Sequence, residues 1–212
     1  NEQPIYLNSR FGPFCIVTVG LIENKEVLVQ DLLNKGVSFT EMTKGAVNST
    51  ELIAKLINTG ESIIDGIERM FEAIEGSCSL LLLNKDGLYA ARDKWGYTPL
   101  VLGKKDDSWA VTSETTAFLN IGFSIEKYLL PGEIILLNDD GLAQRKPGSS
   151  KSQICTFLWI YTGFPASSYE GINVEAVRER CGRFLAKHDK DIEVDVVSGV
   201  PDSGIAHAIG YA

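Results

Sequence analysis

The stretch SCSLLLLNKDGLYAARD, residues 77–93, decides the fold class of this 212-residue chain. Two apolar runs flank the pair Asp86-Gly87, and an Asp-Gly pair between such runs is a strong signal for a tight hairpin turn. The stretch therefore predicts two antiparallel strands. Outward from it, Asp140-Gly141 predicts a second hairpin turn. Further strands are predicted at residues 14–20, 99–102, 109–112 and 133–137.

Helices are predicted on both sides of this hairpin. Residues 62–74 place Ile63, Ile67, Met70 and Phe71 at helical spacing, which gives one apolar stripe suited to covering a sheet. Asn48 or Ser49 is placed to cap the helix before it. The remaining predicted helices cover residues 24–33, 50–58 and 114–121.

A polar segment rich in turn-forming residues, AQRKPGSSKSQ at 143–153, is the predicted linker between two domains. The first domain takes residues 1–142. The second begins in residues 154–212 with a long helix at 174–187, followed by a strand, a loop and the start of another helix. A single strand cannot form a covered parallel sheet, so we expect further sequence to complete this second domain.

Composition excludes several classes of function. A net charge of −8 disfavours nucleic-acid binding, and no apolar run approaches the length of a membrane-spanning helix. The four cysteines are scattered without metal-site spacing, so we expect no metal and a reduced, cytoplasmic protein.

Several stretches resemble glutamine phosphoribosylpyrophosphate amidotransferase, in the order in which that family has them. They are NEQPIYLNSRFGP, GLYAARDKWGYTPLVLGK, SETTAFLNIG, PGEI, CTFLWIY, VEAVRERCGRFLA and GVPDSGIAHAIGYA. The last is the most specific single match. Together the stretches run over nearly the whole chain.

The resemblance implies an α+β fold of the N-terminal-nucleophile hydrolase type, which is a four-layer sandwich of two antiparallel sheets between helices. Here it would lack its leading strands and would be followed by the start of an α/β phosphoribosyltransferase domain. The implied substrates are glutamine and phosphoribosyl pyrophosphate, the implied pathway is purine nucleotide biosynthesis, and the implied assembly is a homo-oligomer.

That family uses an N-terminal cysteine as nucleophile, whereas position 1 here is Asn1. We therefore expect the chain to begin inside a longer gene product and to be inactive as given, with no catalytic residue of its own. The family's oxyanion segment H-N-G-N corresponds to residues 18–21, TVGL, in which only Gly20 matches. The alternative for Gly20 is a simple turn at a strand end.

Two more positions depart from the family. Ser49 stands where a carboxylate would bind the amino group of glutamine, so Asn48 and Ser49 are better explained as helix caps. Thr98 replaces the arginine of the family's RDxxGxRPL stretch. These departures predict a degenerate glutaminase pocket.

In the second domain, the resemblance makes Pro201, Asp202, Ser203 and Gly204 the pyrophosphate loop, because backbone N–H groups before a helix can hold an anion. The alternative is an ordinary turn before a helix. The family's ribose-phosphate motif is not in this sequence, and Mg²⁺ is expected only for a complete transferase domain. Cys155 lies where some relatives bind an iron-sulfur cluster, but a buried apolar role is the better interpretation of one cysteine.

The sequence thus predicts a portion of an amidophosphoribosyltransferase-like protein. An alternative is a degenerate paralogue that serves as a structural or regulatory module without glutaminase activity. A third possibility, a glucosamine phosphate synthase, fits GVPDSG badly.

Overall fold

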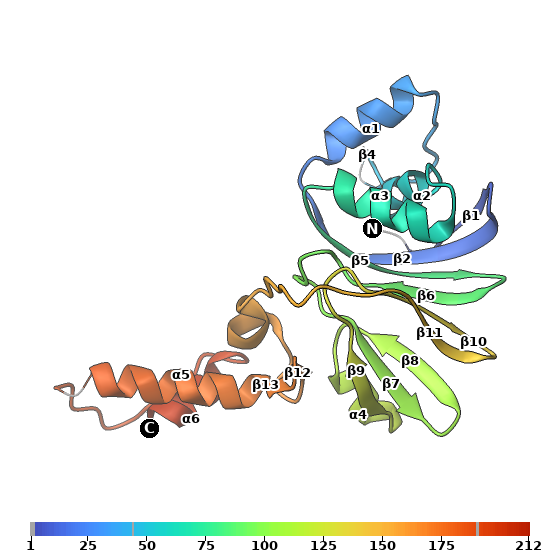
Figure 1. Cartoon of the computed structure of the whole chain (residues 1–212). Coiled ribbons are helices and arrows are strands. Elements are labelled where there is room, and N and C mark those ends of the chain that lie inside the picture. Colours follow the sequence, from blue (N-terminus) through green and yellow to red (C-terminus); the bar gives the residue numbers. More distant parts are fainter. Residues whose placement is uncertain (1–2, 44, 190) are drawn as a thin grey trace. The chain divides into compact units, whose positions relative to one another are not determined.

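A computed structural model describes residues 3–43, 45–189 and 191–212 of the chain. The chain forms two compact units, shown in Figure 1. Unit 1 consists of Asn1–Leu100 and Leu129–Ile154, and unit 2 consists of Val101–Tyr128 and Cys155–Ala212.

Unit 1 is built on a six-stranded antiparallel sheet in the order β1-β2-β5-β6-β10-β11. The strands are β1 (Ile5–Ser9), β2 (Gly12–Ile22), β5 (Gly76–Asn84), β6 (Gly87–Ala91), β10 (Ile134–Asn138) and β11 (Gly141–Lys146). Asn84 pairs with Gly87 across the first hairpin, and Asn138 pairs with Gly141 across the second. Both hairpin turns predicted from Asp-Gly pairs are confirmed.

Three helices cover one face of this sheet, as Figure 1 shows. They are α1 (Lys25–Asn34), α2 (Ser49–Ile57) and α3 (Ile63–Ala73), and the short strands β3 (Met42–Thr43) and β4 (Ala46–Val47) pair before α2. The predicted stripe of α3 is buried, and it packs in one core with Leu80 and Leu82 of β5. The periodicity of 62–74 therefore predicted the correct buried face.

Unit 2 begins with a three-stranded antiparallel sheet in the order β8-β7-β9. Its elements are β7 (Val101–Lys105), β8 (Ser108–Thr112), α4 (Thr116–Ile121) and β9 (Ser124–Tyr128). The rest of unit 2 comprises the π-helical turn η1 (Leu158–Thr162), β12 (Ser168–Tyr169), β13 (Ile172–Asn173), α5 (Val174–His188) and α6 (Gly204–Tyr211). None of the helices in the described ranges combines the length and the apolar character that a membrane crossing needs.

A carboxylate joins the two parts of unit 2. Glu114, just before α4, accepts hydrogen bonds from the hydroxyls of Ser167 and Tyr169, and Tyr169 is 2% exposed. Burial, followed by the charge of Glu114, raises the pKa of the Tyr169 hydroxyl. Residues 101–128 are thus tied to the chain that follows Cys155. The mixture of helices and antiparallel sheets is the predicted fold class.

The unit boundaries differ from the predicted domain boundaries. β11 extends to Lys146, so residues 143–146 of the predicted linker form a strand paired with β10. Residues 101–128, expected within the first domain, belong to unit 2 because β7, β8 and β9 pair with one another and not with the six-stranded sheet. Local composition signals a polar segment but does not say which strand it pairs with.

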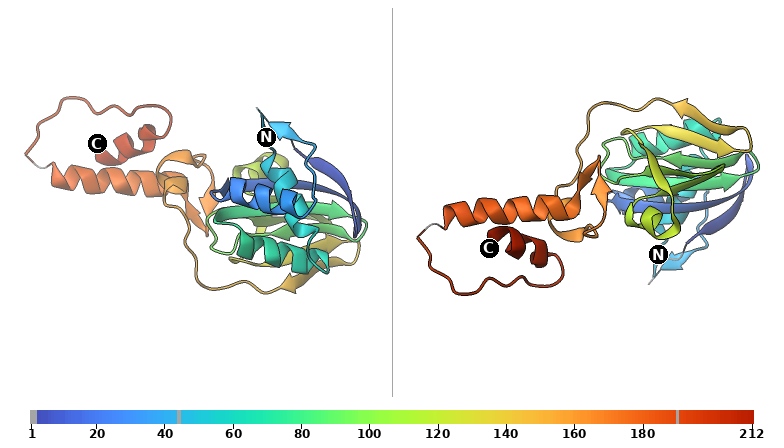
Figure 2. Two further views of the ribbon diagram at one scale, coloured as in Figure 1. Left: turned by 90° about the horizontal axis from the view of Figure 1, so that it is seen from above. Right: turned by 90° about the horizontal axis from the view of Figure 1, so that it is seen from below.

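The strand predicted after α5 is wrong. Residues 191–203 form a long loop, visible in Figure 2, and no strand pairs with it among the residues that the structure describes. Val196 and Val200 are 80% and 79% exposed. Alternating valines favour an extended backbone, but a strand also needs a neighbour for its hydrogen bonds.

Helices α5 and α6 lie side by side in both views of Figure 2, and two glycines set their approach. A Cβ atom on Gly182 would lie 1.9 Å from the carbonyl oxygen of His207, and one on Gly210 would lie 1.9 Å from that of Glu179. The two backbones are therefore in direct contact at both positions. No side chain larger than hydrogen fits either position without movement.

We predict that Gly182→Ala destabilises unit 2, although alanine is the better helix former by about 1 kcal/mol. Steric overlap with the His207 carbonyl should outweigh that gain and lower the free energy of unfolding by about 1–3 kcal/mol. Urea unfolding followed by circular dichroism measures this change in the free energy of unfolding. Arg180→Ala, at an exposed position of α5, is the control. A higher urea midpoint for Gly182→Ala would show that the helices do not touch here.

Candidate functional site

The segment that resembles an oxyanion strand, residues 18–21, lies inside β2. Gly20 pairs with Cys78 of β5, and the strand continues to Ile22. Gly20 has φ of +155°, and a Cβ there would lie 2.0 Å from the carbonyl oxygen of Ser77. The simple turn considered for Gly20 is therefore wrong, because the close approach of β5 is what requires glycine at this position.

The residues on either side of Gly20 present apolar side chains. Val19 is 45% exposed and Leu21 is 65% exposed. Neither side chain can donate a hydrogen bond, so directly beside Gly20 only backbone N–H groups could stabilise an oxyanion.

The second segment for which the resemblance predicts glutamine binding, residues 47–51, contains the cap and the first turn of α2. The side chain of Asn48 accepts a hydrogen bond from the backbone N–H of Thr50 at 2.8 Å, so the predicted helix cap is confirmed for Asn48. Ser49 is the first residue of the helix. Glu51 is 2% exposed, and its carboxylate accepts from the backbone N–H groups of Thr40 and Glu41. The segment is thus fixed by its own cap and by a buried carboxylate.

The structure brings these two segments together through a residue that the sequence gave no reason to select. The hydroxyls of Thr18 and Thr50 are 2.7 Å apart. The side-chain amide of Gln3 donates to the carbonyl of Thr18 at 3.0 Å and accepts from its N–H at 2.8 Å and from the Thr50 hydroxyl at 3.0 Å. Gln3 therefore continues the pairing of β1 with β2 and joins β2 to α2.

The loop after β6 is held by one buried carboxylate. Asp93 is 1% exposed and accepts from the backbone N–H groups of Trp95 and Tyr97 at 3.1 Å each and of Thr98 at 2.8 Å. Thr98 takes part through its backbone, so the change from the family's arginine leaves this contact in place. Arg92 beside it donates to the carbonyls of Leu129 and Gly96.

Asp93 also affects the pKa of the Cys78 thiol. Cys78 lies in β5, where it pairs with Gly20 of β2. Burial, with a smaller contribution from the negative charge of Asp93, raises the pKa of the Cys78 thiol from 9.0 to about 12. A thiol in that state stays protonated and is a poor nucleophile at neutral pH.

We predict that iodoacetamide at pH 8 modifies exposed Cys155 in the folded protein and leaves Cys78 unmodified until urea unfolds the chain. Peptide mass spectrometry after a short pulse of iodoacetamide reports the modification of both cysteines. Equal labelling rates in the folded state would contradict the described burial.

The Cys78 thiol should also make stability depend on pH. Because the folded thiol binds its proton more tightly than the unfolded one, this group should lower the free energy of unfolding as pH rises from 9.0 towards about 12.

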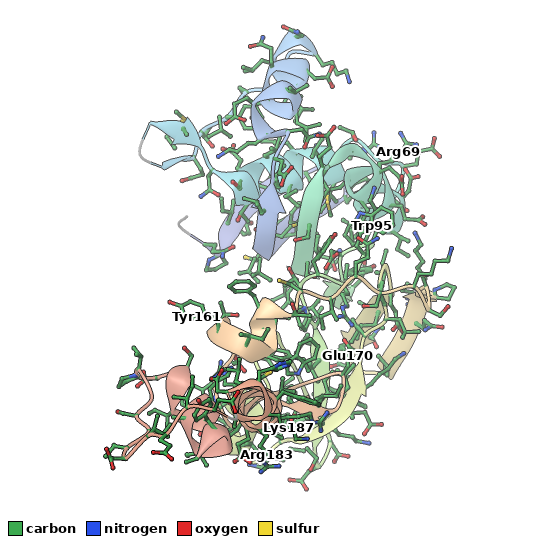
Figure 3. The ribbon with its side chains drawn as sticks, turned by 90° about the vertical axis from the view of Figure 1, so that its left-hand side faces the viewer. Arg69, Trp95, Tyr161, Glu170, Arg183 and Lys187 are labelled. Carbon is green, nitrogen blue, oxygen red and sulfur yellow. The ribbon has the colours of Figure 1, made fainter. Side chains whose placement is uncertain are left out.

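A second candidate site is a cavity of about 800 Å³ in unit 2. One wall is the aromatic segment around η1, including Tyr161 and Phe164, and another is the loop before α6. Three of the four predicted loop residues line it, namely Pro201, Asp202 and Ser203, whereas Gly204 begins α6. Tyr161 is labelled on η1 in Figure 3.

The loop before α6 is tightly turned. The peptide bond between Pro201 and Asp202 is cis. The N–H of Gly204 donates to the carbonyl of Val200 at 2.9 Å, and the N–H of Ile205 donates to the backbone carbonyl of Asp202 at 3.3 Å. A Cβ on Gly199 would lie 2.5 Å from the carbonyl oxygen of Gly204, which explains the glycine at the start of the loop. The loop thus faces the cavity at the N-terminus of an eight-residue helix.

Charges of both signs border this cavity. Glu175 and Asp202 contribute carboxylates, and Arg178, which is 2% exposed, contributes a guanidinium. No sequence pattern singled out Arg178, because one arginine in an amphipathic helix is normally on its solvated face.

Cys155 is exposed, so the buried apolar role considered for it is wrong. Within the described ranges, no group of three or more His, Cys, Asp or Glu side chains is arranged to hold a metal ion.

A family model described as a glutamine amidotransferase domain matches residues 1–120. The chain therefore belongs to the glutamine amidotransferase domain family. Among solved structures, glutamine phosphoribosylpyrophosphate amidotransferase from Bacillus subtilis, complexed with ADP and GMP, is 33% identical. It superposes with a TM-score of 0.89 over 100% of this chain and 46% of that one. A structure titled the allosteric regulatory enzyme of purine biosynthesis gives 0.88 and 33% identity over 99% of this chain and 44% of that one.

The chain is similar along its whole length to curated amidophosphoribosyltransferases. Identity is 32% to the one from Methanocaldococcus jannaschii and 35% to the one from Archaeoglobus fulgidus, each over 100% of this chain. These alignments cover 48% and 46% of the two relatives. The chain thus spans about half the length of the curated relatives it matches.

Proposed function

We propose that this chain is part of an amidophosphoribosyltransferase-like protein of purine nucleotide biosynthesis. Such a protein would transfer the amide nitrogen of glutamine to phosphoribosyl pyrophosphate to give phosphoribosylamine. The observation that carries the proposal is the similarity to amidophosphoribosyltransferases over 100% of the chain, together with a TM-score of 0.89. Residues 1–142 would form the amidotransferase part, and residues 154–212 would begin the phosphoribosyltransferase part.

The loop Pro201–Asp202–Ser203–Gly204 is the proposed pyrophosphate site. Its position at the N-terminus of α6 and beside a cavity of about 800 Å³ supports this assignment. Two carboxylates, Glu175 and Asp202, would repel a bare pyrophosphate, so the lining suits a pyrophosphate accompanied by Mg²⁺, for which carboxylate oxygens are ordinary ligands. The complete protein would act in the cytoplasm as a homo-oligomer.

A second candidate is a degenerate module without glutaminase activity. Val19, Leu21 and Ser49 favour it, because none supplies the donor or the carboxylate that the glutamine-binding segments of the family would carry at those positions. Both candidates keep the scaffold of Gly20 and the Asn48 cap, and they differ in whether glutamine is the nitrogen source.

The experiment measures pyrophosphate release from phosphoribosyl pyrophosphate by the full-length natural product, with glutamine or with ammonium as the nitrogen source. The proposed enzyme should release pyrophosphate with either nitrogen source, whereas the degenerate module should release it with ammonium and much more slowly with glutamine. If the natural product is the degenerate module, the variant Val19→Asn with Ser49→Asp should raise the rate with glutamine by about 10²–10³, since one oxyanion donor contributes that much, while the rate with ammonium stays unchanged.

Val27→Asn, at another exposed valine of unit 1, is the matched control for the added amide. No release with either nitrogen source would rule out the proposed enzyme. Efficient use of glutamine by the natural product would instead rule out the degenerate module. Intact mass spectrometry after treatment with an electrophilic glutamine analogue separates the causes, because one adduct on an N-terminal cysteine would place the nucleophile upstream of Asn1.

A further inference from the structure

The strongest unexplained group outside the glutamine-binding segments is the buried guanidinium of Arg178. It lies in the first half of α5 and is only 2% exposed. Removing such a charge from water is costly unless hydrogen bonds compensate. Arg178 Nε donates to the carbonyl of Trp159 at 2.8 Å, and Nη2 donates to the carbonyl of Gly163 at 2.8 Å. The charge is thus anchored on two backbone carbonyls.

These two carbonyls belong to the turn that forms the aromatic wall of the cavity and to the residue after it. The π-helical turn η1 covers Leu158–Thr162, and the N–H of Gly163 closes it by donating to the carbonyl of Leu158 at 2.8 Å. A planar guanidinium that binds the carbonyls of Trp159 and Gly163 fixes the spacing between these two residues.

The aromatic side chains of this wall are not held by burial of their own. Tyr161 is 65% exposed and Phe164 is 58% exposed, so their position depends on the backbone that carries them. Trp159 is the fixed point, because its indole N–H donates to the carbonyl of Ile172 at 2.9 Å and its ring lies 5.7 Å from that of Tyr169, edge to face. Arg178 links this fixed point to Gly163.

Charge gives Arg178 a second effect on the same cavity. Among the described residues that line it, Arg178 is the only basic one, against the carboxylates of Glu175 and Asp202. A buried positive charge beside the loop of residues 201–203 favours an anion there, and burial preserves its field from screening by salt.

We propose that Arg178 is the positioning residue of this cavity. It acts through the carbonyls of Trp159 and Gly163 to hold the aromatic wall opposite the loop Pro201–Ser203, and this arrangement admits a pyrophosphate group. The inference rests on the proposed function, in which that loop binds pyrophosphate. It adds that the two-pronged shape of the guanidinium, and not its charge alone, is required.

The test is isothermal titration of the full-length natural product with magnesium pyrophosphate in a buffer free of phosphate and sulfate. Arg178→Ala should weaken binding at least about tenfold, because two hydrogen bonds from a charged donor are lost. Arg178→Lys should be nearly as weak, since an ammonium cannot span both carbonyls. Arg183→Ala is the control on the same helix, where the exposed side chain pairs only with Glu179 in the described structure, and it should bind within about twofold of the wild type. Arg183 is labelled in Figure 3.

Chemical rescue distinguishes positioning from a general loss of structure. Ethylguanidinium should restore the affinity of Arg178→Ala for pyrophosphate, and ethylammonium should not, because only the former reproduces the planar fork. Circular dichroism checks that each variant keeps its helices, and if Arg178→Ala does not fold, Arg178→Lys decides the question.

Four results would overturn the inference. Wild-type affinity in Arg178→Lys would show that charge alone is sufficient. Wild-type affinity in Arg178→Ala, or rescue of that variant by both cations alike, would show that the fork is not needed. If the wild-type polypeptide binds no pyrophosphate while all variants fold normally, the proposed pyrophosphate site itself fails, and the role of Arg178 fails with it.

Discussion

The buried carboxylate of Asp93 fixes the loop that follows β6 in unit 1. It accepts from three backbone N–H groups of the loop at residues 95–98, those of Trp95, Tyr97 and Thr98, which would otherwise lose these partners at the edge of the core. Ser79 of β5 adds to this arrangement, because its hydroxyl accepts from the N–H of Asp93 at 3.0 Å and donates to the carbonyl of Thr98 at 3.0 Å. The loop is therefore fastened to the central strands of the sheet. It also contacts the end of the predicted linker, because the N–H of Gln153 donates to the carbonyl of Trp95 at 2.8 Å.

Three residues of unit 1 serve the backbone directly. Gly20 allows the close approach of β5, Asn48 caps α2, and Asp93 holds the loop after β6. Val19, Leu21 and Ser49 differ from the residues of the family's segments at the corresponding positions. We propose that the chain retains a glutamine amidotransferase scaffold with an altered pocket, since fold and function are separable.

Features that depend on neighbours in the sequence could be predicted, and those that depend on distant partners could not. The two Asp-Gly hairpins and the Asn48 cap are local, and the stripe of α3 follows from helical periodicity alone. The clamp that Gln3 makes on Thr18 and Thr50 joins residues 15 and 47 positions away, so no local pattern revealed it. The strand expected after α5 failed for a related reason, because valines favour extension but cannot provide a pairing strand. Likewise, the burial of Arg178 follows from carbonyls 19 and 15 residues before it.

Asp93 holds the loop at residues 95–98 rigidly against the sheet of unit 1. Trp95 and Tyr97 are 42% and 37% exposed, so surface amides without such a partner would exchange with solvent within about seconds to minutes. Native-state hydrogen exchange, resolved by residue, measures the protection of these amides. We expect the amides of Trp95, Tyr97 and Thr98 to be protected nearly as strongly as those of Leu80 and Leu82 in β5. Exchange of these three amides at the rate of an unstructured peptide would show that Asp93 does not hold the loop.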